Sequence, residues 1–260
     1  MAKLAVARTV ARKKPLPKRN WVVESLRVTA FPKELDQSLK GPEWNKLFGS
    51  EPERYETRPQ EAYEIQSGKL GEVIGVLERR PERLDLKLSP YVDPGTRPPL
   101  FQGFGKFDEA FASHKSKFRK WLAACPKLKR LAFGAVLVIP CDSKQQGLNI
   151  LQEFLEGSVI IDEKKTRDFQ YMKNIPKKSK IIKGIEINKL CTWSVMTGEI
   201  MAVGPSGMTQ SGETGFACHL VLDFNTDQEH IDGWAKNKNF ALLDELYAHA
   251  NDVTTKGDVL

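Results

Sequence analysis

Short runs of alternating apolar and polar residues, each bounded by glycine or proline, fill the first half of the chain. Leu84, Leu86 and Leu88 alternate with charged residues, and a period of two places the three leucines on one face of a strand. Together with two earlier runs, this pattern predicts an antiparallel meander made of Ala62–Gln66, Glu72–Glu78 and Arg83–Ser89. A chain with such runs must fold around an antiparallel sheet.

Helical periodicity of about 3.6 residues appears in longer segments. Phe107–Ala124 predicts a helix with an apolar stripe, and Phe240–Ala250 predicts another near the end of the chain. Shorter helical pieces are expected at Glu34–Leu39, Glu43–Phe48 and Ser143–Leu155. The remaining expected strands are Trp21–Phe31, Arg130–Pro140, Ile181–Lys189, Thr192–Val203 and Phe216–Phe224. The mixture predicts an α+β fold.

The order strand, helix, antiparallel strands, helix occurs twice. It divides the chain into a flexible basic arm at 1–20, a first α+β half at 21–128 and a second at 129–260, which share one core. We therefore expect two pseudo-repeated halves with their helices packed on one face of the sheets. This order resembles the duplicated architecture of TATA-box-binding-like or helix-grip proteins, which hosts binding proteins and enzymes alike and so decides no function.

Positive charge is concentrated in the arm. The chain has 40 bases and 33 acids, and residues 1–20 contain seven of the bases and none of the acids. The rest of the chain is therefore neutral, and any argument from basicity concerns the arm or local patches. An alternative interpretation is that the arm is a transit peptide. Transit peptides form amphipathic helices, and Pro15 and Pro17 would interrupt such a helix here.

A second basic segment, Asp162–Lys183, carries a local excess of five positive charges. Phe169 and Tyr171 lie among its bases and are candidates for stacking on nucleobases. Basic segments bind phosphates by releasing counterions, whereas the alternative is a solvated surface connection or tail. The residues predicted to bind nucleic acid are Arg8, Arg12, Lys13, Lys14, Lys18, Arg19, Lys164, Lys165, Arg167, Phe169, Tyr171, Lys177, Lys178 and Lys180.

No catalytic motif is evident, and we expect no cofactor and no metal. His219 and Asp223 share one strand face, which suits acid–base chemistry or a structural polar pair. The stretch Gly204–Gly215 lacks the lysine and the following helix of a phosphate-binding loop, so we expect a mobile loop. Four cysteines without a CxxC pair indicate reduced, mostly buried thiols, and Cys141 is expected to be buried and inert despite preceding a helix.

Four places resemble a sporadically distributed family of uncharacterised bacterial and archaeal proteins of about this length. They are the early Val22–Glu24 strand, the Arg83–Leu86 strand, the helix Phe107–Ala124 leading into Phe133–Ile139, and Leu220–Phe224 before the Leu243–Leu246 helix. The resemblance covers most of the chain after the arm. It implies a role in mobile or defence-associated systems and assigns no catalytic residue.

These observations favour a non-catalytic binding or scaffolding subunit that contacts nucleic acid or an acidic partner and works with other proteins. One alternative is a protein–protein subunit without nucleic-acid contact. Another is an enzyme with a pocket near His219 and Asp223. No run of residues approaches the length of about 18 apolar residues that a membrane span needs, so a cytoplasmic protein is expected.

Overall fold

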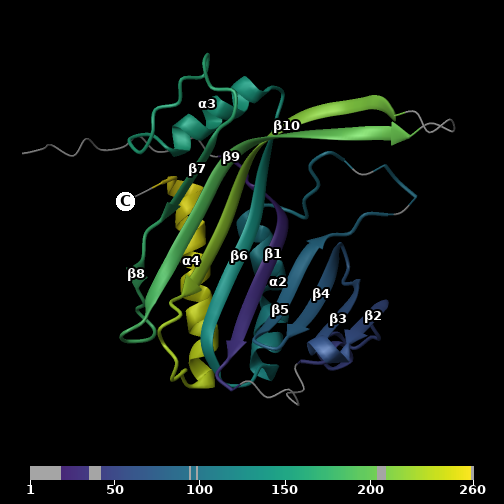
Figure 1. Ribbon diagram of the computed structural model, residues 1–260, viewed down its shortest axis with the longest axis vertical. Helices are drawn as coiled ribbons and strands as arrows, with labels where there is room; N and C mark the ends of the chain where they lie inside the picture. The colour runs from purple at the N-terminus through teal and green to yellow at the C-terminus, as the bar shows by residue number, and fades with distance from the viewer. Residues whose placement is uncertain (1–18, 35–41, 94, 98, 204–208, 259–260) are drawn as a thin grey trace, which may run out of the picture.

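The computed structural model describes residues 19–34, 42–93, 95–97, 99–203 and 209–258, with backbone alone at 200–203 and 209–213. In this part of the chain one large antiparallel sheet is covered by helices, which confirms the α+β class (Figure 1). The strand order is β2-β3-β4-β5-β1-β6-β10-β9-β7, and β8 also pairs with β9. No helix in the described ranges is long and apolar enough to cross a membrane.

The elements of the first half follow one another closely. They are β1 (Val22–Pro32), α1 (Trp44–Phe48), β2 (Arg54–Arg58), η1 (Pro59–Glu61), β3 (Tyr63–Lys69), β4 (Val73–Arg80), β5 (Arg83–Pro90) and α2 (Phe107–Ala124). Those of the second half are β6 (Leu128–Cys141), α3 (Lys144–Phe154), β7 (Gln170–Asn174), β8 (Lys177–Lys178), β9 (Glu186–Val203), β10 (Thr209–Thr226), η2 (Lys236–Lys238) and α4 (Asn239–Lys256).

The two halves meet at the centre of the sheet, where β1 and β6 pair antiparallel. On the outer side of β1 lies β5, and on the outer side of β6 lies β10. The helices that follow these two strands, α2 and α4, contact each other and lie along the same face of the sheet (Figure 1). The helix order and the shared face therefore agree with expectation, while a repeat relating the two halves stays a prediction.

The core forms between this face and the helices. Strand alternation aligns Leu86 with Val28 and Val28 with Phe133, so buried side chains run across adjacent strands. From the helices, Phe111 meets Phe133 edge-on with ring centroids 5.6 Å apart, and Tyr247 stacks on Phe111 at 3.8 Å. Full burial of an apolar side chain of this size stabilises the fold by about 1.5–3 kcal/mol.

Several expected boundaries are wrong. The strand β2 was not anticipated, and β7 and β8 lie within the segment expected to be a surface connection. The strand expected from Ile181 begins only at Glu186, because a turn precedes it. The expected loop after 203 is strand from Thr209 onward, because β10 continues pairing with β9 beyond a bulge. Residues 204–208, and residues 35–39 of the expected Glu34–Leu39 helix, lie outside the described residues.

The opposite face of the sheet is partly covered by the segment between β5 and α2. Leu100 and Phe101 pack over Gly198 of β9 and Gly215 of β10, which are paired neighbours. A Cβ on Gly215 would lie 2.8 Å from Leu100 Cδ1, so the absence of a side chain at this position permits the close approach.

Candidate nucleic-acid interface

The predicted arm residues fall mainly outside the described part of the chain. Arg8, Arg12, Lys13, Lys14 and Lys18 all lie there. Arg19 is described, and its Nη2 atom lies 3.1 Å from Glu153 Oε1 in α3. Trp21, two residues later, packs on Phe154. The described start of the chain, Arg19 to Trp21, which we call the root of the arm, therefore lies beside α3 at the upper end of the molecule in Figure 1.

Three further predicted bases, Lys164, Lys165 and Arg167, lie in the connection that follows α3 and are exposed. Acidic residues surround them. Lys165 pairs with Asp162 at 3.5 Å, and Asp168 is 3.5 Å from Lys144 of α3. Because bases and acids alternate here, this upper region offers little net positive charge to a phosphate chain.

The two predicted stacking aromatics face inward. Phe169 and Tyr171 are partly buried and pack against the core. The hydroxyl of Tyr171 donates to Asp258 at 3.2 Å, and Lys173 Nζ lies 2.8 Å from the same carboxylate. Tyr171 and Lys173 thus attach Asp258, which follows α4, to β7. A stacking role for Phe169 and Tyr171 stays a prediction.

The remaining predicted bases belong to β8 and to the turn that joins it to β9. We define the basic turn as Lys177, Lys178, Lys180 and Lys183, of which Lys183 was noted in the sequence without being predicted as a binding residue. All four lysines are exposed, and none forms an ion pair within the described ranges. The turn therefore presents four exposed lysines to solvent, with Glu186 opposite Lys178 in β9 as the adjacent exposed acid.

The basic turn is held in place by Glu245 of α4. Ser179 Oγ donates to Glu245 Oε2 at 2.6 Å, and the Lys180 backbone N–H donates to Oε1 at 2.7 Å. Ile182 and Ile185 are buried beneath the turn. The lysine backbones are thus fixed before any ligand arrives, which reduces the ordering cost of binding.

A second cluster of lysines lies at the same end of the molecule. We define the lysine end cluster as Lys33, Lys127, Lys236 and Lys238, which are exposed and without ion pairs among the described residues. The Lys33 N–H donates to the Lys127 carbonyl at 2.9 Å, and the Trp234 N–H donates to Leu128 at 3.2 Å. Backbone contacts therefore bring together turns that are far apart in the sequence.

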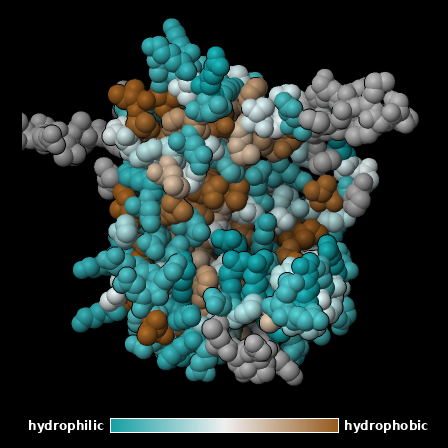
Figure 2. Space-filling view, viewed as in Figure 1, coloured by the Kyte–Doolittle hydropathy of each residue, from teal (hydrophilic) through white to brown (hydrophobic). Residues whose placement is uncertain are grey.

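Both clusters lie at the lower end of Figure 1, where β8 turns into β9 and α4 begins. Figure 2 shows mainly hydrophilic side chains over this end in that view. The exposed acids there are Glu34, Glu186, Glu229 and Asp232, and the partly exposed Asp227 and Glu245 lie beside the basic turn, which makes six acids against eight lysines. Sequence analysis did not single out the lysine end cluster, because its members come from separate turns with no shared motif.

His219 and Asp223 share the sheet face away from the helices, as expected, but they do not form a pair. Asp223 lies 3.7 Å from Arg27 and accepts a hydrogen bond from Asn225 at 3.1 Å. His219 is opposite Val138 and Ser194 in the adjacent strands. Burial lowers the pKa of His219 below its ordinary value. A carboxylate partner for acid–base chemistry is thus missing from the described contacts of this histidine.

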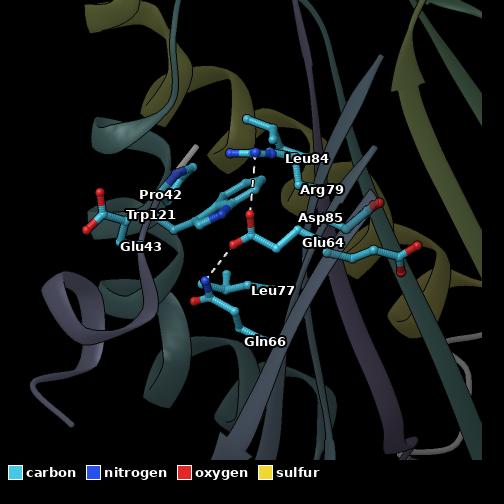
Figure 3. A pocket seen from close by; sticks show the side chains of 10 residues that line it. Pro42, Glu43, Glu64, Gln66, Leu77, Arg79, Leu84, Asp85 and Trp121 are labelled. Atoms are coloured by element: carbon cyan, nitrogen blue, oxygen red, sulfur yellow. Dashed lines mark hydrogen bonds and ion pairs between the residues drawn. The ribbon is translucent and has the colours of Figure 1, made fainter. Parts of the chain in front are cut away.

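A cavity of about 240 Å³ lies between β3, β4, β5 and the end of α2 (Figure 3). Three of its polar side chains, Glu64, Gln66 and Arg79, interact with one another. Glu64 lies 3.4 Å from Arg79 and accepts from Gln66 at 2.6 Å, and Gln66 accepts from the Trp44 N–H at 3.0 Å. Figure 3 shows the Glu64 carboxylate between Arg79 and Gln66. This arrangement is typical of a structural polar cluster, and no serine, threonine, cysteine or histidine lines it.

Comparison of the chain with protein-family models, with curated proteins and with solved structures found no match. Within the described ranges, no group of three or more His, Cys, Asp or Glu side chains is placed to hold a metal ion. The functional argument therefore rests on the charge distribution of the lower end.

Proposed function

We propose that the protein is a non-catalytic binding subunit whose lower end engages the phosphate backbone of a nucleic acid. The observation that carries the proposal is that the basic turn and the lysine end cluster both lie at the lower end of the sheet. All eight lysines are exposed, and none of them forms an ion pair in the described ranges. Each lysine that neutralises a phosphate releases counterions and favours binding.

The chemistry of the surface suggests backbone contact rather than base reading. Lysine offers a point charge, whereas sequence is read through side chains such as arginine or asparagine that form two hydrogen bonds to a base edge. Phe169 and Tyr171, the aromatic side chains of the segment Asp162–Lys183, are partly buried and pack against the core, which disfavours base stacking there. We therefore expect binding with little sequence preference.

The test measures binding of labelled single- and double-stranded DNA and RNA to the full chain at low salt. Replacing Lys177, Lys178 and Lys180 by glutamate is expected to weaken binding about tenfold or more, because three attractive contacts become repulsive. The matched control replaces Lys164, Lys165 and Arg167 by glutamate and changes the net charge equally. Equal losses in the two variants would mean that net charge, rather than the lower end, controls binding.

A chain that begins at Asn20 tests the contribution of the arm. Because Arg19 and the basic turn lie at opposite ends of the sheet, the arm and the turn are separate contact points in this proposal. Retained binding by the shortened chain would support the lower end as the principal contact. Complete loss would assign the contact to the arm.

The same surface would suit an acidic protein partner, in which case a protein copurifies and nucleic acids do not bind.

An enzymatic role near His219 would require that His219→Ala abolish an activity without unfolding the chain. We also propose that the protein works in a prokaryotic defence or mobile-element complex, which rests on the resemblance to the sporadically distributed family. An internal repeat of TATA-box-binding-like type rests on the order of helices and strands in the sequence.

A further inference from the structure

Two cysteines from different strands meet beneath α3. Cys141 is the last residue of β6, and Cys218 lies in the neighbouring β10, where it opposes Ile139. The two are diagonal neighbours on the helix-covered face, and their Sγ atoms are 3.7 Å apart. A disulfide requires about 2.05 Å between the sulfurs and Cα atoms about 4.4–6.8 Å apart. Diagonal neighbours on adjacent strands have Cα atoms about 7–8 Å apart, so closing the bond requires the end of β6 to move toward β10.

The two thiols differ in access to solvent. Cys141 is partly exposed, which contradicts the expectation that it is buried, whereas Cys218 has no exposed surface. The Cys218 thiol donates to the Gly147 carbonyl at 3.2 Å, and a Cβ on Gly147 would lie 3.7 Å from Cys141 Sγ. A small oxidant can therefore reach Cys141 from solvent, and Cys218 is positioned directly behind it.

Local electrostatics favour a thiolate at the exposed position. The contact with the Cys218 thiol is the largest influence and, against burial, lowers the pKa of Cys141 below its ordinary value. Among the charged neighbours, Arg19 lowers this pKa and Asp142 raises it. The hydrogen bond to Cys141 and burial raise the pKa of Cys218. A lowered pKa increases the thiolate fraction of Cys141, and the thiolate is the nucleophilic form.

The other two cysteines provide an internal contrast. Cys125 and Cys191 are both buried. Burial raises the pKa of each thiol above its ordinary value, that of Cys191 to about 12. Buried, protonated thiols react slowly with oxidants.

We propose that Cys141 and Cys218 form an oxidisable pair that closes to a disulfide in the presence of a peroxide. The Cys141 thiolate attacks a peroxide oxygen, the O–O bond breaks, and a sulfenic acid and a hydroxide form. The hydroxide takes up the proton that the Cys141 thiol released on ionisation and becomes the first water. The Cys218 sulfur then attacks the Cys141 sulfur, the S–O bond breaks, and the departing hydroxide takes the proton of the Cys218 thiol. In balance, two thiols and one hydrogen peroxide give one disulfide and two waters.

The test treats the reduced full chain with a small excess of hydrogen peroxide at neutral pH and follows intact mass and peptide linkage. We expect the mass to fall by two hydrogens and a Cys141–Cys218 peptide to appear, with Cys141 reacting at least about tenfold faster than Cys125 or Cys191. Random linkages, or similar rates at all four thiols, would overturn the proposal.

Variants separate the two chemical steps. Cys218→Ser is expected to stop at a sulfenic acid on Cys141, which dimedone traps, and Cys141→Ser is expected to give neither product. Cys125→Ser is the control and is expected to form the disulfide at the wild-type rate. Dimedone labelling absent from Cys218→Ser, or disulfide formation surviving in Cys141→Ser, would contradict the assignment. The wild-type peptide map decides the matter even if a variant fails to fold.

Discussion

At the scale of single residues, Gly257 and Asp258 fasten the end of α4 to the rest of the fold. Gly257 has a φ of +73°, and a Cβ there would overlap the Phe154 carbonyl. The next residue donates its N–H to that same carbonyl at 2.9 Å. The position thus requires glycine for both its backbone conformation and its close packing.

Gly257→Ala is therefore expected to lower the free energy of unfolding by about 3 kcal/mol. Gly71 is the matched control, because its φ is +79° but nothing lies within 4 Å of a Cβ placed there. Gly71→Ala should cost only about 1 kcal/mol, the penalty of the backbone conformation alone. Denaturant unfolding measures both values, and equal losses would show that the overlap with Phe154 is relieved without cost.

Asp258 makes part of this attachment dependent on pH. Burial alone would raise the pKa of Asp258, but hydrogen bonds from Lys173, Ser158 and Tyr171 lower it below the ordinary 3.8. A folded-state pKa below that of the unfolded chain stabilises the fold above the unfolded value, and this stability is lost as pH falls through the folded value.

Asp258→Asn is accordingly expected to lose about 1–3 kcal/mol at pH 7. The difference from the wild type should shrink as pH falls below 3.8 and through the folded-state pKa. Asp252→Asn breaks an exposed ion pair with Lys256 and serves as the control, with an expected change within about 0.5 kcal/mol. A constant difference between wild type and Asp258→Asn from pH 7 to pH 3 would contradict the assigned role.

At the scale of elements, Glu245 links α4 to the basic turn. Glu245→Ala is expected to speed hydrogen exchange at the amides of Lys180, Ile181 and Ile182 and to cost about 1–3 kcal/mol. Asp244→Ala, one residue earlier in α4, removes exposed ion pairs to Lys115 and Arg119 and is the control. It should leave exchange in the turn unchanged. Equal exchange in both variants would show that Glu245 does not hold the turn.

Elements with strong local periodicity were predictable from the sequence. The boundaries of α2 coincide with the predicted helix Phe107–Ala124, because the apolar stripe alone determines it. The strands β2, β7 and β8 were not predicted, since their short and polar sequences become strands only through backbone pairing with a neighbour. The lysine end cluster was missed for the same reason, because tertiary contacts create it.

At the scale of the whole molecule, the sheet separates two chemically different ends. The upper end holds the thiol pair and the root of the arm beside α3, with bases and acids intermixed. The lower end gathers the basic turn and the lysine end cluster. The sequence predicts one binding surface from the arm and the segment Asp162–Lys183, whereas the described Arg19 and the basic turn lie at opposite ends of the sheet.

The measurement that tests this account most directly is the salt dependence of nucleic-acid affinity. The full chain is compared with a variant in which Lys177, Lys178, Lys180 and Lys183 are all glutamine. If each lysine neutralises one phosphate, the slope of log affinity against log salt becomes shallower by roughly 3–4 in the variant. An unchanged slope, or no binding by the full chain at low salt, would contradict the proposed role of the lower end.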